Sequence, residues 1–191
     1  VKSGVLGRIT GIDGSFRCLH NSEKRQWLRQ FPGGMMFYLG CHTIDMMLLI
    51  NGMPDAVIPF NRSSGCDCDG ARDSCFAVLD YPHGVCGVRV NAVEVNGYSR
   101  RQLVICGSGG TIEIKPLEQP TLLRESLLPR TEGVGWADIS QRIFPGYLPG
   151  RYDKMMLEFA ACVRGEKENP FTPEYELDVQ KVVMQACGIQ V

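Results

Sequence analysis

Three polar side chains interrupt an otherwise apolar stretch of the sequence, and their chemistry suits the movement of a proton. The stretch GGMMFYLGCHTIDMMLLING runs from Gly33 to Gly52 and contains Tyr38, His42 and Asp45. An imidazole titrates near pH ~6.5, whereas a phenol has a pKa of about 10 and is normally a neutral hydrogen-bond donor. A histidine with a hydroxyl group one turn away could hold an alcohol and move its proton. His42 and Tyr38 are therefore candidate catalytic residues.

The spacing of these residues predicts one polar stripe on an amphipathic helix. Residues four and seven positions apart lie on the same helical face, and the apolar residues between 35 and 50 follow the same period. Two readings stay open from the spacing alone. Either each polar group bonds a neighbouring backbone group at the border of the core, or Tyr38 and His42 line a site. Asp45, one turn deeper, is predicted to make a structural hydrogen bond.

Substrate contacts are predicted on both sides of this helix in the sequence. Paired glycines let the backbone approach a ligand closely, so Gly34 is one candidate. Residues 117–150 are predicted to be a long loop with little regular structure. Aromatic rings can stack on sugars and guanidinium groups donate to hydroxyls or carboxylates, so we add Trp136, Arg151 and Tyr152. The alternative is a surface loop with a few packed aromatic side chains.

Composition narrows the class of protein. The chain has 191 residues, is 44% hydrophobic and 21% charged, and carries a net charge of −1, which is ordinary for a globular domain with a sizeable core. No basic patch or charge block appears, so neither nucleic acid nor a membrane surface is a predicted partner. We find no signal peptide and no apolar run of about 18 residues. Together these features predict a cytoplasmic protein.

Nine cysteines are present, and most lie in apolar or alternating runs, as small buried thiols do. The stretch GCDCDGARDSC lacks a fourth zinc ligand at a usual spacing, so we predict no metal site. His20 ends the first predicted strand; it could face the site but is not included in it.

The elements come in runs of one type. Strands are predicted at 7–20 and 55–62 and as four between 73 and 115, and helices at 22–30, 35–50, 151–164 and from 173 onward. This order predicts a single α+β domain over residues 1–191, with a mostly antiparallel open sheet and helices packed on one face. The other face should be solvated or paired with another subunit. We therefore predict a homodimer or homotetramer formed through the open sheet face.

The segment WLRQFPGGMMFYLGCHTIDMMLLINGMP resembles the signature of the Gfo/Idh/MocA oxidoreductase family. That signature has a Trp–Arg pair, glycines, an apolar stretch, and then Gly-x-His-x-x-Asp on a helix that ends in Gly and Pro. The residues at matching places are Trp27, Arg29, Gly33, Gly34, Gly40, His42 and Asp45. KSGVLGRITGID and LVICGSGGTIEI are similar to the family's interdomain crossing and to one of its hairpins.

The resemblance implies a two-domain enzyme that transfers a hydride between a nicotinamide cofactor and a sugar or polyol hydroxyl. A Rossmann domain binds NAD or NADP, and a second domain, of the dihydrodipicolinate-reductase-like type, supplies substrate contacts and the subunit interface. The chain begins without Met and has no Gly-x-Gly-x-x-Gly after an early strand. It is therefore expected to be the second domain only, inactive alone and without cofactor-binding residues.

One position departs from the family pattern. Many family dehydrogenases have Asp four residues before the histidine, and this chain has Tyr38 there. A carboxylate accepts a hydrogen bond from a substrate hydroxyl and tunes the histidine, whereas a neutral phenol donates. The alternatives are therefore a catalytically inert ligand-binding or assembly protein, or an NAD-dependent glycoside hydrolase.

Overall fold

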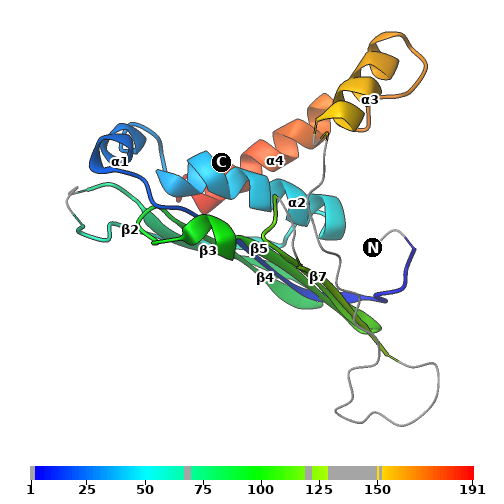
Figure 1. The fold of residues 1–191 in the computed structure, drawn as a ribbon, viewed down its shortest axis with the longest axis horizontal. Helices are drawn as coiled ribbons and strands as arrows, with labels where there is room; N and C mark the ends of the chain where they lie inside the picture. The colour runs from blue at the N-terminus through cyan, green and yellow to red at the C-terminus, as the bar shows by residue number, and fades with distance from the viewer. Residues whose placement is uncertain (1–2, 67–69, 119–121, 129–149, 151) are drawn as a thin grey trace.

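In the described part of the chain, a mixed sheet of seven strands carries the helices on one of its faces (Figure 1). The computed structural model describes residues 3–66, 70–118, 122–128, 150 and 152–191. The strands are β1 (Ile9–Arg17), β2 (Ala56–Arg62), β3 (Ser74–Tyr81), β4 (Gly84–Asn91), β5 (Gln102–Gly107), β6 (Gly110–Lys115) and β7 (Leu122–Leu127). Their spatial order is β2-β3-β4-β1-β5-β6-β7. Among these described strands, only β1 and β4 pair in parallel, which confirms the mostly antiparallel sheet.

Strand β7 corrects the prediction of a loop over 117–150. Residues Leu122–Leu127 pair with β6 along its whole length. An unpaired β6 would leave a row of backbone groups at the sheet edge, and β7 satisfies them. Arg124 also pairs with Glu113 across the two strands at 3.2 Å. The sequence LLRESL did not predict this strand, because its apolar and polar residues do not alternate regularly.

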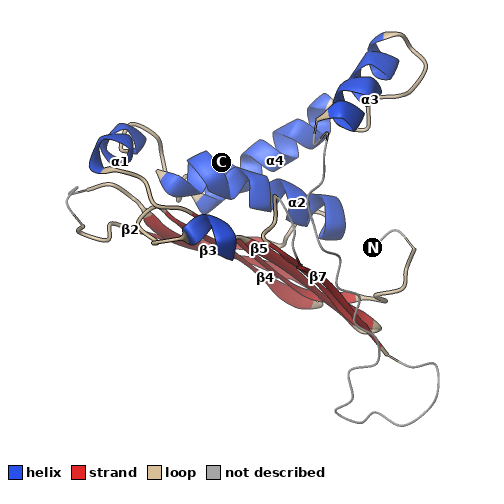
Figure 2. Cartoon of the chain, viewed as in Figure 1, coloured by secondary structure: helices blue, strands red, loops and turns tan. Residues whose placement is uncertain are grey.

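The helical elements are α1 (Ser22–Leu28), the π-helical turn η1 (Met36–Gly40), α2 (Cys41–Asn51), the short 3-10 helix η2 (Gly97–Arg100), α3 (Asp153–Val163) and α4 (Pro173–Ala186). The side chain of Asn21 caps α1 by accepting from Lys24 N at 2.9 Å. Thr172 caps α4 by accepting from Tyr175 N at 3.2 Å. Figure 2 shows that the helices of the described residues lie on the same face of the sheet.

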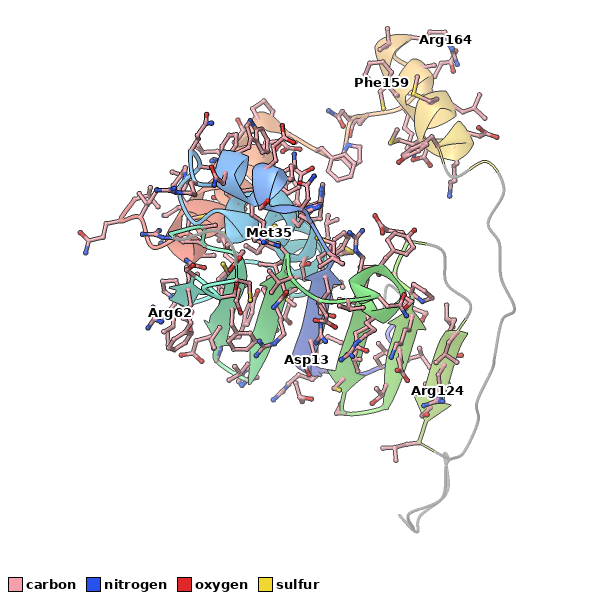
Figure 3. The ribbon with its side chains drawn as sticks, turned by 60° about the vertical axis from the view of Figure 1, so that its left-hand side comes forward. Asp13, Met35, Arg62, Arg124, Phe159 and Arg164 are labelled. Atoms are coloured by element: carbon pink, nitrogen blue, oxygen red, sulfur yellow. The ribbon has the colours of Figure 1, made fainter. Side chains whose placement is uncertain are left out.

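The core lies between the sheet and the helices. Helix α2 buries Thr43, Ile44, Met47 and Leu48, and α4 buries Val182, Val183 and Ala186. Met35 lies in the same layer, between the helices and the strands (Figure 3). The thiols of Cys18, Cys75, Cys86 and Cys187 are buried, as predicted for small apolar groups, whereas Cys106 and Cys162 are only half-buried. No helix in the described part of the chain is long and apolar enough to span a bilayer.

Candidate functional site

His42 is an exposed side chain on the first turn of α2, where it lines two neighbouring pockets. The aromatic pocket, of about 330 Å³, is lined by Trp27, Phe31, Phe37, Tyr38, Cys41, His42, Gln180 and Val183. The acidic pocket, of about 340 Å³, is lined by Phe16, His42, Asp45, Met46, Leu117 and Glu118. The histidine is the residue that the two pockets share.

The aromatic pocket is held by ring contacts between α1 and the segment before α2. The Trp27 ring lies edge-on to Phe31 at 4.7 Å and to Tyr38 at 5.9 Å between centroids. Phe31 and Phe37 stack at 5.7 Å. Lys24 Nζ lies 3.7 Å from the Trp27 centroid and 4.5 Å from that of Tyr38. Such cation–π contacts hold a positive charge beside the rings.

The acidic pocket lies on the other side of His42. The Phe16 ring of β1 lies 5.7 Å from the His42 ring. Glu118 forms an ion pair with Arg101, whose guanidinium carbon lies 4.7 Å from the Phe16 centroid. Asp45 accepts a hydrogen bond from the Tyr175 hydroxyl. The pocket therefore combines an apolar wall with two carboxylates that each have a protein partner.

The polar stripe predicted from the sequence is thus divided between two pockets. Tyr38 and His42 share the aromatic pocket, and His42 and Asp45 share the acidic one. The π-helical turn η1, which contains Tyr38 and ends one residue before α2, changes the winding that the prediction assumed to be uniform. The neighbouring Thr43 and Ile44 face the core, which fixes the position of His42 on a buried helix.

Gly34 lies in a third pocket, with Arg29 and Arg72, and lines neither pocket of His42. Its φ is +55°, and a Cβ there would lie 2.5 Å from the Arg72 carbonyl oxygen. Gly33 has φ of +70°, and a Cβ there would lie 2.5 Å from Cys187 Sγ. Both glycines therefore have a structural reason to be glycine. The substrate-binding role of Gly34 stays a prediction.

Of the other predicted substrate residues, Tyr152 is in the described part of the chain. Tyr152 is exposed immediately before α3 and lines neither of the two pockets. Trp136 and Arg151 lie outside the described residues. Within the described part of the chain, no cluster of His, Cys, Asp or Glu is arranged to hold a metal ion.

His20 lies beside the predicted site, although sequence reasoning left it out. Its ring is 6.1 Å from the Tyr38 ring, and its Nε2 is buried with no hydrogen-bond partner among protein atoms. Burial lowers the pKa of His20 below its usual value, and the positive charges of Lys24, Arg101 and Arg25 lower it further. The signal in the sequence was weak, because His20 follows β1 and Tyr38 lies in η1, so the two rings meet only through tertiary packing.

The fold and this site define an α+β domain in which an exposed histidine on a core helix lines two pockets. Residues 1–113 match the GFO/IDH/MocA C-terminal domain family, and the chain belongs to that family. No curated protein matched the chain.

Solved structures of several oxidoreductases have a similar fold. UDP-N-acetylglucosamine 3-dehydrogenase GnnA from Acidithiobacillus ferrooxidans is 14% identical, with a TM-score of 0.71, over 98% of this chain and 56% of that one. The WlbA dehydrogenase from Bordetella pertussis, solved with NADH and UDP-GlcNAcA, is 17% identical, with a TM-score of 0.65, over 98% and 55%. An oxidoreductase from Bacillus cereus is 16% identical, with a TM-score of 0.68, over 99% and 57%. This chain therefore spans little more than half the length of these relatives.

Proposed function

We propose that this chain is the substrate-binding and oligomerisation domain of a nicotinamide-dependent oxidoreductase that acts on a hydroxyl group of a sugar or polyol. The observation that carries the proposal is the place of His42. It is an exposed imidazole between two pockets, on a helix whose opposite side is buried. Family membership and the dehydrogenases among the solved relatives support the same reading.

The cofactor, NAD or NADP, would supply the hydride chemistry and would be bound mainly by another domain. The glycines Gly107–Gly110 of this chain connect β5 to β6 in a hairpin and open no helix. Dinucleotide phosphates are bound where a glycine-rich turn leads from a strand into a helix. The glycine cluster therefore does not fit a pyrophosphate, and we assign no cofactor-binding residue in the described part of the chain.

The chain's own residues would position the alcohol and carry its proton. During oxidation, a ring nitrogen of His42 would take the hydroxyl proton as the carbon gives up its hydride. Tyr38, in the same pocket, would donate a hydrogen bond that orients the substrate. The rings of Trp27 and Phe31 offer an apolar wall on which the CH face of a sugar could pack.

The test uses the longer protein that contains this domain, incubated with NAD or NADP and a panel of sugars and polyols. We expect nicotinamide reduction that falls by about 10²–10⁴-fold in His42→Gln, as for loss of a general base. His83→Gln is the matched control, because His83 is exposed in the turn between β3 and β4. Cofactor binding without reduction of the nicotinamide by any substrate would contradict the proposal.

The second candidate is an inert family protein or an NAD-dependent glycoside hydrolase, and the observation in its favour is Tyr38. The side chain at this position is a phenol, and the described residues that line the aromatic pocket include no carboxylate. Release of an aglycone without net NADH formation would identify the hydrolase. Cofactor binding with neither reaction would identify the inert protein.

The open sheet face is proposed as the subunit interface. Ile58 and Phe60 of β2 and Val85 of β4 expose about half of their surface there, at 48%, 46% and 55%. Exposed apolar side chains on an uncovered sheet favour pairing with a second copy. Sedimentation should give a dimer or tetramer, and Phe60→Lys should weaken it. A 21.2 kDa monomer at all concentrations would contradict this assignment.

A further inference from the structure

Helix α3 extends away from the body of the molecule and has no buried residue (Figure 1). Phe159 and Arg164 lie on this projecting part in Figure 3, far from the sheet. An isolated helix shorter than about 12–15 residues is marginal in water, and α3 has 11 residues. We therefore expect α3 to be stabilised by packing against a further surface.

One side of α3 forms an apolar groove with the connection to α4. The groove has a volume of about 490 Å³ and is lined by Met155, Glu158, Phe159, Cys162, Val163, Lys167, Asn169, Pro170 and Phe171. Its large apolar side chains are exposed, with Met155 at 54%, Phe159 at 64% and Val163 at 71%. Contiguous exposed apolar groups of this kind mark interaction surfaces.

The charged side chains around the groove already form ion pairs within α3 and the connection to α4. Glu158 pairs with Lys167 at 3.3 Å and with Lys154 at 4.0 Å. Arg164 pairs with Glu166 at 2.6 Å. The unsatisfied part of this surface is therefore apolar, which fits a protein partner of apolar character.

A short series of contacts connects the groove to the pocket of His42. Phe171 lines the groove, and its ring lies 5.9 Å from the Tyr175 ring. Tyr175 donates to Asp45, and Asp45 lines the acidic pocket together with His42. A partner seated on the groove would thus lie on the helix side of the sheet, next to the candidate site.

We propose that the α3 groove is the docking surface for the nucleotide-binding part of a longer chain. This inference rests on the proposed function. Three solved relatives match 98% or 99% of this chain, yet this chain covers only 55% to 57% of theirs. Nearly half of each relative has no counterpart here and could cover such a groove.

A second copy would instead use the sheet face, on the other side of the molecule from the helices (Figure 2). Docking on α3 would bring the cofactor domain beside His42.

Hydrogen exchange of the α3 amides tests the proposal. It is measured by mass spectrometry in the 191-residue chain and in the longer protein. We expect fast exchange of the α3 amides in the short chain and at least ~10-fold slower exchange in the longer protein. The reason is that the docked interface must open before the α3 amides can exchange. Phe159→Glu in the longer protein should restore fast exchange. Leu157→Glu is the matched control, because Leu157 is 71% exposed and does not line the groove.

Other outcomes would overturn the docking. Equal exchange in both proteins would do so. Slow exchange of the α3 amides already in the 191-residue chain would also overturn the docking. Slow exchange that is independent of protein concentration would mean that the chain's own residues cover the groove. Slow exchange that increases with protein concentration would mean that a second copy covers it. The activity assay separates this proposal from the proposed function. Protected α3 without nicotinamide reduction retains the docking alone, and reduction with unprotected α3 retains the function alone.

Discussion

Tyr175 of α4 donates its hydroxyl hydrogen to the carboxylate of Asp45 on α2, across 130 positions of the sequence. The same hydroxyl lies 3.3 Å from the carbonyl oxygen of Asp45. This bond connects the exposed first half of α4 to the helix that carries His42. It confirms the structural hydrogen bond predicted for Asp45, which therefore acts on the position of α2.

Tyr175→Phe should destabilise the chain by about 1–3 kcal/mol, because it leaves a half-buried carboxylate without its donor. Urea denaturation would give the free energy of unfolding for the wild type, Tyr175→Phe, Asp45→Asn and the double variant. The double-mutant cycle should show a coupling energy between the two positions. Additive effects would contradict an energetic role for the bond. Tyr98→Phe is a control at an exposed tyrosine.

The same bond predicts a loss of stability at alkaline pH. Burial, and then the hydrogen bond to Asp45, raise the pKa of Tyr175 well above its usual value. The unfolded chain therefore loses the phenolic proton first, so this contribution is complete below pH ~10 and is lost as pH rises beyond it. The wild type should lose more stability than Tyr175→Phe between pH ~10 and the highest usable pH. Parallel curves for the two proteins would refute this assignment.

Arg25 of α1 and Asp73 before β3 form an ion pair at 3.6 Å, with side chains only 4% and 1% exposed. Arg25 also donates to the carbonyl oxygens of His20 at 2.7 Å and Cys66 at 3.0 Å, and Asp73 accepts from Ser64 N and Oγ. Removal of one partner leaves the other charge buried. Arg25→Met should therefore cost about 3–5 kcal/mol.

Thermal and urea unfolding measure that cost. Arg25→Lys should not restore stability, because an ammonium group cannot reach both carbonyls and the carboxylate in the guanidinium geometry. Arg62→Met, at an exposed arginine that ends β2, is the control and should change stability by less than about 0.5 kcal/mol. Similar losses for Arg25→Met and Arg62→Met would show that the buried pair contributes little.

The helix that carries His42 was predictable because its signals are local. The apolar period, the terminal Gly52 and the position of His42 all lie within one stretch of sequence. The division of the site into two pockets was not predictable. It depends on the π-helical turn before Cys41 and on Glu118, which reaches the pocket of His42 through the packing of strands β5 and β6. Such contacts join distant segments, and no local pattern encodes them.

The roles of the paired glycines can be separated from ligand binding by a stability series. Gly33→Ala and Gly34→Ala combine a left-handed backbone with a clash, against Cys187 and the Arg72 carbonyl respectively. Each should lose at least about 2 kcal/mol. Gly52→Ala is the control, since φ is +74° but nothing lies within 4 Å of the added Cβ, so only the backbone cost applies. Equal losses at all three positions would mean that the packing contacts are unimportant.

His20 offers a direct test of the electrostatics beside Tyr38. Burial first, and then Lys24, Arg101 and Arg25, lower the pKa of His20. The chain has three histidines, so NMR of labelled imidazoles can follow each one, with His20→Gln for assignment. His20 should titrate below pH ~6.5, its usual value. Because the folded pKa is the lower one, the unfolded chain binds this proton first. The contribution to stability is therefore present above pH ~6.5 and is lost on acidification.

Lys24→Met should raise the pKa of His20 part of the way toward its usual value. The substitution removes the positive charge that lies over the Tyr38 and Trp27 rings, but the imidazole stays buried. Lys167→Met, in the connection between α3 and α4, is the matched control. It should leave the His20 titration unchanged, since Lys167 pairs with Glu158 instead. Identical His20 titrations in the wild type and Lys24→Met would show that Lys24 does not act on the imidazole. The positive charge beside Tyr38 would then have no electrostatic effect on the neighbouring histidine.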